Sequence, residues 1–198
     1  MVIGSHNSWS FLTPKKWWMK LIGFTARCQR VSFASQFHAG ARCFDLRVRF
    51  SDVAFWSIVH GPVEYKWHNG YYWYDIHDDL RRINDCHQLV FVRVILDLRS
   101  KQGRENREQQ IKWFKEICRE LEDMYPYIKF WCGRILPDWT VAYRFSCEPT
   151  CEEKYASVCK PKWLDDWWPW LYARIHNRKN LTAGSDKDIL LIDYVDIK

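Results

Sequence analysis

The 198-residue sequence contains no run of about 18 apolar residues, which is the length that a helix needs to cross a bilayer. We therefore expect no membrane-spanning segment. The N-terminus also lacks a charged stretch followed by an apolar one, so the sequence predicts no cleaved secretion signal. These absences leave the cytoplasm, or release by cell lysis, as the expected locations.

The cysteines lack the spacing of a zinc site, and the charges lack the clustering of a nucleic-acid-binding segment. The eight cysteines show no paired CxxC spacing of a zinc site, and free thiols are expected even for the cluster Cys147, Cys151 and Cys159. The formal net charge of +6 is spread along the chain and forms no basic arm. This argues against a nucleic-acid partner and is compatible with an anionic substrate or membrane surface.

Residues 1–198 are enough for one full hydrophobic core and too few for two, so a single domain is predicted. The 13 tryptophans are more than one core can hide, and some should lie at a surface that is apolar on one side and wet on the other. The segment TPKKWWMK at 13–20 combines a helix-start signal with lysines and tryptophans. It predicts either an ordinary surface helix or a helix on a membrane, with Trp17 and Trp18 at headgroup level.

Strand-like segments of this sequence carry charged or titratable residues. The run 41–48 contains Asp45 and Arg47, separated by one residue, so a strand would point both side chains to the same face. Short segments before His6 and His60 also have the pattern of strands. The run LVFVRVILDLR at 89–99 is typical of a parallel strand buried on both faces.

Strand and helix patterns alternate along the chain, which indicates an α/β layer or barrel whose strand ends share one mouth. Two histidines could transfer protons at this mouth, and guanidinium groups could bind an anion. The polar residues expected there are His6, Asp45, Arg47, His60, Arg99, Arg144 and Asp193. This composition predicts chemistry on a phosphate ester.

Four segments resemble, in order and spacing, the catalytic X domain of phosphatidylinositol-specific phospholipase C, especially the small bacterial and single-domain members. They are IGSHNS at 3–8, QFHAGARCFDLRVR at 36–49, VHGP at 59–62 and VRVILDLRSK at 92–101. The resemblance implies a distorted or incomplete TIM-type (β/α) barrel. It also implies cleavage of a phosphatidylinositol-type phospholipid to diacylglycerol and a cyclic inositol phosphate, with His6 as general base and His60 as general acid.

Arg47 bears on the question of a metal ion. The resemblance implies that calcium-dependent members have an acidic ligand here, whereas bacterial members have an arginine, which can neutralise the phosphate without a metal. Arg99 also stands at a position that is acidic in calcium-dependent members, while Asn7 is similar to the calcium-dependent motif. We therefore expect no cofactor, since two arginines make calcium binding electrostatically poor.

The resemblance implies further site residues. Asp45 joins Arg47 among the catalytic residues, and the residues expected at the substrate are Asn7, Arg99, Arg144, Glu153 and Tyr155. The TPKKWWMK segment falls where bacterial members carry a membrane-contacting helix, which favours the membrane interpretation of Trp17 and Trp18. The expected partner is a phospholipid at a membrane surface. The protein itself is expected to be a monomer that binds the membrane peripherally, and its head-group preference stays open.

Asp193 would orient His6, as the aspartate of the last barrel strand does in the family. The segment between Arg178 and Asp188 is too short for the extra strand that bacterial members have there. Either the barrel has fewer than eight strands, or the segment 189–195 is the penultimate strand and Asp193 cannot reach His6.

Two other functions remain open from the sequence. One is a glycerophosphodiester phosphodiesterase, which would need an acidic metal-ligand pair where Asp45 and Arg47 stand. The other is a lipid-binding module without activity on the same scaffold. The second loses support if His6 and His60 point into one pocket.

Overall fold

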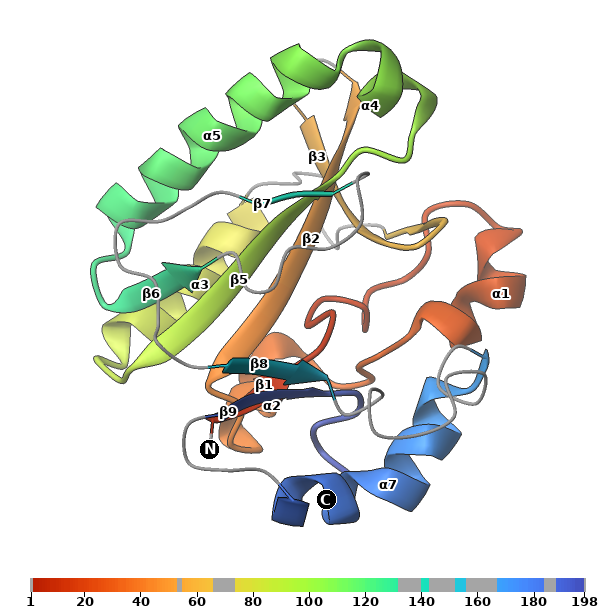
Figure 1. The fold of residues 1–198 in the computed structure, drawn as a ribbon, viewed down its shortest axis with the longest axis vertical. Coiled ribbons are helices and arrows are strands. Elements are labelled where there is room, and N and C mark those ends of the chain that lie inside the picture. The colour runs from red at the N-terminus through yellow and green to blue at the C-terminus, as the bar shows by residue number, and fades with distance from the viewer. Residues whose placement is uncertain are drawn as a thin grey trace.

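A twisted sheet of nine strands forms the centre of the computed structural model (Figure 1). The structure describes residues 2–52, 55–65, 74–131, 140–142, 152–155, 167–183 and 188–197. The strands are β1 (Val2–Ser5), β2 (Cys43–Asp52), β3 (Phe55–His60), β4 (Val63–Glu64), β5 (Val90–Asp97), β6 (Ile128–Trp131), β7 (Thr140–Ala142), β8 (Glu152–Tyr155) and β9 (Asp188–Ile192). The helices are α1 (Met19–Ala26), α2 (Phe33–His38), α3 (Tyr74–Asp85), α4 (Lys101–Glu105), α5 (Arg107–Met124) and α7 (Pro169–Ala183).

Six strands of the sheet run parallel, in the order β8, β9, β1, β2, β5, β6. The other three are antiparallel to their neighbours. β3 pairs with the second half of β2 and with β4, and β7 pairs with the second half of β5. Helices α3, α4 and α5 lie around β2, β5 and β6, and α2 and α7 lie near β1 and β9 (Figure 1). Helix α1 contacts β4 and α7.

The predicted TIM-type barrel is wrong. Within the described residues, the outer strands β8 and β6 do not pair with each other, so the sheet stays open. A barrel of this type needs a crossover after each strand, whereas only residues 53 and 54 separate β2 from β3. With so short a connection β3 can only turn back along β2, and it pairs antiparallel with the part of the β2 edge that lies beyond β1.

The core confirms the prediction for the strand at 89–99. Every residue of β5 is buried, as expected for a strand covered on both faces. α5 packs Phe114, Cys118 and Leu121 into the core along one face of an amphipathic helix. The fold thus buries the apolar side chains of β5 and those along one face of α5.

One prediction about local structure needs correction. The helix expected from Thr13 begins only at Met19, because Pro14 forms a bridge with Tyr65 and residues 15–18 turn into the helix. After β5 the chain enters α4, whose first turn is capped by the Ser100 hydroxyl, which accepts from the Gly103 amide. In the described part of the chain no helix has both the length and the apolar character needed to span a bilayer.

Candidate active site

The arrangement of β1, β2 and β3 brings two histidines together. β1 lies against one edge of β2 up to the pair Ser5–Phe44, and β3 occupies the same edge from the pair Ile58–Val48 onward. Because β1 is parallel and β3 antiparallel to β2, both strands end at the short stretch between these two pairs. His6 follows β1 and His60 ends β3, so their rings meet there, with centroids 5.6 Å apart.

Pairing of β1 with β9 brings Asp193 to His6. Gly4 permits this pairing, because a Cβ atom at this position would overlap the side chain of Leu191. His6 Nδ1 lies 2.8 Å from Asp193 Oδ1, and a carboxylate only accepts, so Nδ1 carries the proton. The last described strand is thus the neighbour of β1, and the alternative that leaves His6 without Asp193 is excluded.

Asp45 and Arg47 lie on the same face of β2, as the strand pattern predicts. Arg47 Nε donates to Asp45 Oδ2 at 3.0 Å, and Arg47 Nη2 donates to His6 Nε2 at 2.9 Å. His6 is therefore neutral here, because a protonated ring could not accept. Arg93 Nη1 lies 3.7 Å from Asp45 Oδ1. Burial alone would raise the pKa of Asp45, but the charges of Arg47 and Arg93 outweigh it and hold this pKa well below its usual range.

His60 is partly buried, and its contacts define its tautomer. Nδ1 lies 2.8 Å from the Ala26 carbonyl oxygen, which only accepts, so Nδ1 carries the proton and Nε2 has the lone pair. The thiol of Cys28 lies 3.5 Å from the same Nδ1. Burial, followed by the charge of Arg47, lowers the pKa of His60 from 6.5 to about 3, so the ring is neutral at neutral pH.

A cavity of about 210 Å³ opens between these side chains. It is lined by His6, Thr25, Ala26, Cys28, His60, Gly61, Pro62, Pro169 and Asp193. Imidazole, carboxylate and thiol groups thus face one space, which is bounded by the end of α1 and the start of α7. A single phosphodiester there could contact both imidazoles.

Neither Asn7 nor Arg99, the predicted substrate-binding residues whose side chains the structure describes, lines this cavity, although Asn7 contacts two residues that do. Asn7 is buried, and its Nδ2 lies 3.3 Å from His6 Nε2 and 3.7 Å from Cys28 Sγ. Arg99 does not line the cavity, because its Nε bonds to both oxygens of Asp97 at 3.1 and 2.9 Å. Glu153 and Tyr155 lie in β8, whose side chains are outside the described part, and Arg144 lies outside the described residues altogether.

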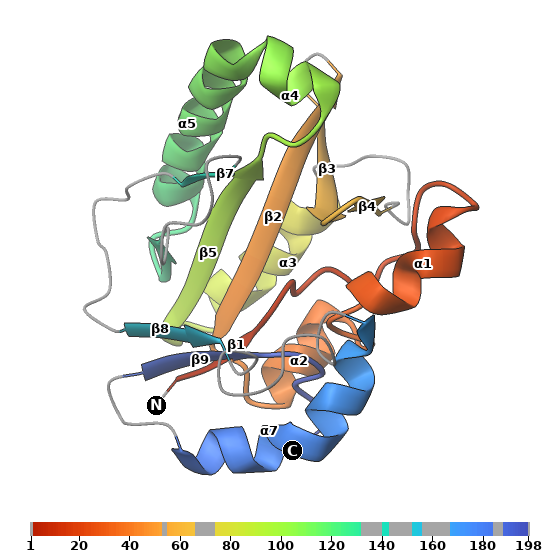
Figure 2. The same ribbon diagram turned by 45° about the vertical axis from the view of Figure 1, so that its right-hand side comes forward.

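Trp17 and Trp18 lie at the surface, with 75% and 40% of their areas exposed. They belong to a larger group of exposed apolar side chains just before and on α1 and around the first half of α7, and these two helices contact each other. The group, called here the apolar rim, is Trp17, Trp18, Leu21, Ile22, Phe24, Trp167, Trp168, Trp170, Leu171 and Ile175. α1 and α7 lie on the same side of the molecule and border the cavity (Figure 2).

Three residues of the site were missed by sequence reasoning. Gln29 is fully buried and donates to the backbone oxygens of His6 and Ile192, at 3.1 and 2.9 Å, so it holds the two strand ends together. Cys28 lies in the cavity without a sequence motif around it. Arg93 was detectable, because an arginine in the middle of an otherwise apolar buried strand requires an acidic partner.

Comparisons with known proteins were made by sequence and by structure. No family model matches the chain, and no curated protein matches it. Among solved structures, the phosphatidylinositol-specific phospholipase C from Listeria monocytogenes is similar with a TM-score of 0.60 and 16% identity, over 98% of this chain and 87% of that one. A structure of the Staphylococcus aureus enzyme is 26% identical over 47% of this chain and 29% of its own, with a TM-score of 0.37. The first likeness shows a shared fold, and the second is too partial to add to it.

Proposed function

We propose that this chain is a phospholipase C-like enzyme that cleaves a phosphatidylinositol-type phospholipid to diacylglycerol and a cyclic inositol phosphate. The observation that carries the proposal is the pair of imidazoles of His6 and His60, 5.6 Å apart at one cavity, with the Arg47 guanidinium 2.9 Å from His6. This reaction needs one group that accepts a proton, one group that donates a proton, and a cation at the phosphate. The two imidazoles and the guanidinium are suited to these three tasks. The fold shared with a bacterial enzyme of this activity adds support.

His6 acts as the general base. Its Nδ1 proton is held by Asp193, which keeps the Nε2 lone pair for the inositol 2-hydroxyl proton and stabilises the imidazolium that forms. The hydroxyl oxygen then attacks the neighbouring phosphorus. Arg47 now donates to this lone pair, so the anionic phosphodiester has to attract the guanidinium away from it.

His60 acts as the general acid and gives a proton to the departing diacylglycerol oxygen as the phosphorus–oxygen bond breaks. Without substrate its pKa is too low for this task, because burial and the charge of Arg47 favour the neutral ring. The negative charge of a bound phosphodiester opposes both effects and raises the pKa. His60 therefore takes up its proton when the substrate binds.

Arg47 takes the place of a metal ion in this proposal. Its guanidinium is fixed by Asp45, whose carboxylate is fully buried and ion-paired on its other side with Arg93. A fixed cation stabilises the charge that develops on the phosphoryl oxygens in the transition state. A glycerophosphodiester phosphodiesterase would use an acidic metal-ligand pair here, and the Asp45–Arg47 ion pair does not favour that alternative.

The lipid reaches the cavity from a membrane surface. The apolar rim provides tryptophans and aliphatic side chains beside the cavity, and the exposed Lys16, Lys20 and Arg174 lie among them. Tryptophans next to basic residues are typical of proteins that bind to anionic lipid interfaces. This surface would let the enzyme reach a head group without extracting the lipid.

The test is a product assay on phosphatidylinositol vesicles with a chelator present. Cyclic inositol phosphate should be released, and His6→Ala and His60→Ala should each lower its rate by about 10²–10⁴-fold. His38→Ala, at an exposed position outside the cavity, should keep the parent rate. Strict dependence on calcium would overturn the role of Arg47. Vesicle binding without any product would instead support the lipid-binding module.

A further inference from the structure

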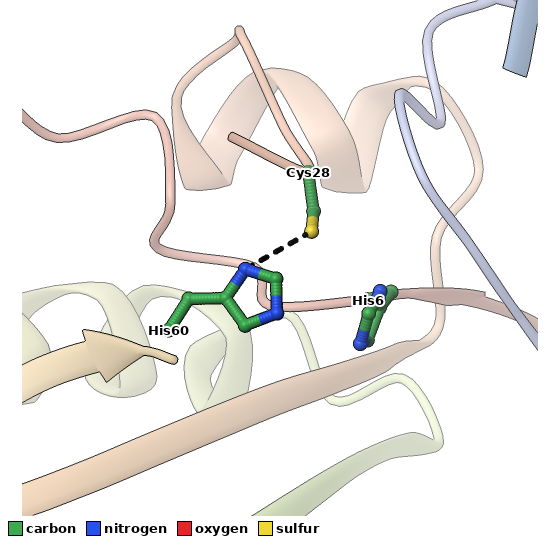
Figure 3. A group of neighbouring side chains, drawn as sticks. All are labelled: His6, Cys28 and His60. Atoms are coloured by element: carbon green, nitrogen blue, oxygen red, sulfur yellow. Dashed lines mark hydrogen bonds between the residues drawn. The ribbon is translucent and has the colours of Figure 1, made fainter. Parts of the chain in front are cut away.

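Cys28 gives the cavity a thiol that the proposed reaction does not use. It is buried and free, and it lies between the two imidazoles and Asn7. Figure 3 shows His6, Cys28 and His60 directed toward a common space. One donor atom from each of these three residues lies within 4.8 Å of the other two.

The distance between the ligand atoms of Cys28 and His60 suits a tetrahedral metal ion. Zinc bonds of about 2.3 Å to sulfur and about 2.0 Å to nitrogen place these two ligand atoms about 3.5 Å apart at a tetrahedral angle. Cys28 Sγ and His60 Nδ1 are 3.5 Å apart. Nε2 of His6 completes three protein ligands once the Arg47 guanidinium, which donates to it in this structure, moves away. A cavity of about 210 Å³ has room for a water molecule in the fourth position.

The surroundings also fit a metal ion that binds sulfur and nitrogen. Asp193 accepts from Nδ1 of His6, an arrangement in which a carboxylate orients a metal-binding imidazole. Use of Nδ1 by His60 would remove its hydrogen bond to the Ala26 oxygen, but this oxygen keeps the one from the Tyr65 hydroxyl, at 2.8 Å. Binding therefore leaves no buried oxygen without a donor.

We propose that Cys28, His60 and His6 form a binding site for Zn²⁺, which reversibly blocks the active site. On binding, Cys28 releases its thiol proton, and the single ring proton of His60 moves from Nδ1 to Nε2. A neutral imidazole has only one lone pair, so a zinc-bound His6 cannot accept a proton from the substrate. The binding site stands on the geometry alone, whereas the block rests on the function proposed above.

Cobalt is the spectroscopic probe for the binding site. Full-length protein titrated with Co²⁺ should develop the near-ultraviolet absorption of a cobalt–thiolate bond, with one equivalent bound and with displacement by Zn²⁺. Since the chain has eight cysteines, the band is assigned by substitution. Cys28→Ser should abolish it, whereas Cys118→Ser, which changes another buried free cysteine far from the cavity in α5, should preserve it.

His60→Gln is the second variant and should weaken Co²⁺ binding by at least about tenfold, even if Cys28→Ser proves unstable. Circular dichroism verifies the fold of each variant. A band that survives in Cys28→Ser, or a parent protein without any cobalt–thiolate band, would overturn the site. Neither result depends on catalysis, so the binding site and the proposed function can fail separately.

The block is tested with phosphatidylinositol vesicles and buffered free Zn²⁺. The parent rate should fall as the ion is added and return with chelator. Each variant is compared with its own metal-free rate, and Cys28→Ser should need at least about tenfold more Zn²⁺ for the same fractional loss. Equal sensitivity of Cys28→Ser and the parent would refute the block.

Discussion

The tripeptide Asp-Leu-Arg occurs twice in this chain, and the two copies differ in what surrounds them. In β2, Asp45 and Arg47 lie inside the sheet beside His6 and Arg93. At the end of β5, Asp97 and Arg99 bond to each other, and the Arg99 side chain is 35% exposed against 13% for Arg47. Identical residues at identical spacing thus give a candidate catalytic cation in one place and a closed ion pair in the other.

The second copy contributes to the site indirectly. Asp97 Oδ2 lies 3.1 Å from Arg49 Nη2, and the same Nη2 donates to the Gly61 carbonyl oxygen at 2.9 Å. Gly61 follows His60 and lines the cavity. This ion pair therefore positions the turn after the proposed acid, while the first copy contacts the proposed base.

The largest difference between the copies is expected in stability. Asp45→Ala removes a fully buried carboxylate and leaves Arg47 and Arg93 facing each other without an anion, so the free energy of unfolding should fall by about 3–5 kcal/mol. Asp97→Ala should cost less, because Arg99 can turn into water and Arg49 keeps its hydrogen bond to the Gly61 carbonyl oxygen. Urea unfolding of both variants measures the two losses, and equal losses would mean that burial of the first pair carries no extra weight.

The catalytic difference is tested at the arginines. Arg47→Ala should lower the rate of phosphatidylinositol cleavage by about 10²–10³-fold, because a fixed cation at the phosphate is lost. Arg99→Ala is the matched control, and its rate should stay within about threefold of the parent, as for an exposed ion pair. Vesicle assays with chelator give both rates. Similar losses at the two positions would show that the copies act together.

The first copy alone has a histidine beside it with a strongly lowered pKa, which predicts a pH dependence of stability. The pKa of His60 is about 3 in the folded chain and about 6.5 when unfolded, so the unfolded state binds the extra proton between these values. Stability should therefore fall as pH falls from 6.5 toward 4.5, and His60→Gln should reduce this fall. The pKa of His77 is lowered by burial too, and His77→Gln measures that separate contribution.

Thermal unfolding between pH 4.5 and 6.5 tests this prediction. The pKa values of Glu64, Asp45 and Asp97 are themselves lowered, so their contributions to stability are lost below this window. A slope that is the same in His60→Gln and the parent would show that His60 titrates normally in the folded chain.

The smallest effect is expected at the apolar rim. Trp17→Ala with Trp18→Ala should weaken binding to anionic phosphatidylinositol vesicles by about tenfold, through lost indole burial in the lipid interface, and should spare cleavage of a soluble substrate. Tyr127→Ala, an exposed aromatic residue at the start of β6, is the control. Sedimentation with vesicles measures binding. Equal losses on vesicles and soluble substrate would point to a structural role instead.

The sequence predicted the parts of the site that depend on local patterns. Alternation along a strand placed Asp45 and Arg47 on one face, and the continuous apolar run predicted the burial of β5. The meeting of His6, His60 and Asp193 was also expected, although the proposed roles of these residues remain predictions. The predicted barrel was wrong because the order of strands does not reveal that β3 turns back along β2. Cys28 and Gln29 come from a connection without a repeating pattern, so only the folded chain places them in the site.

The end-to-end arrangement of β1 and β3 along β2 has a consequence for the proposed phosphodiester substrate. Between the two strands, only residues 45–47 of that edge have no strand partner there, and Ser8 occupies part of the space by bonding to the backbone of Asp45. The number of unpaired positions on β2 therefore sets the distance between the two imidazoles, because one follows β1 and the other ends β3. Lengthening either strand by two residues would leave no room between the two imidazoles. Shortening one strand would place the imidazoles too far apart to act on a single phosphorus centre.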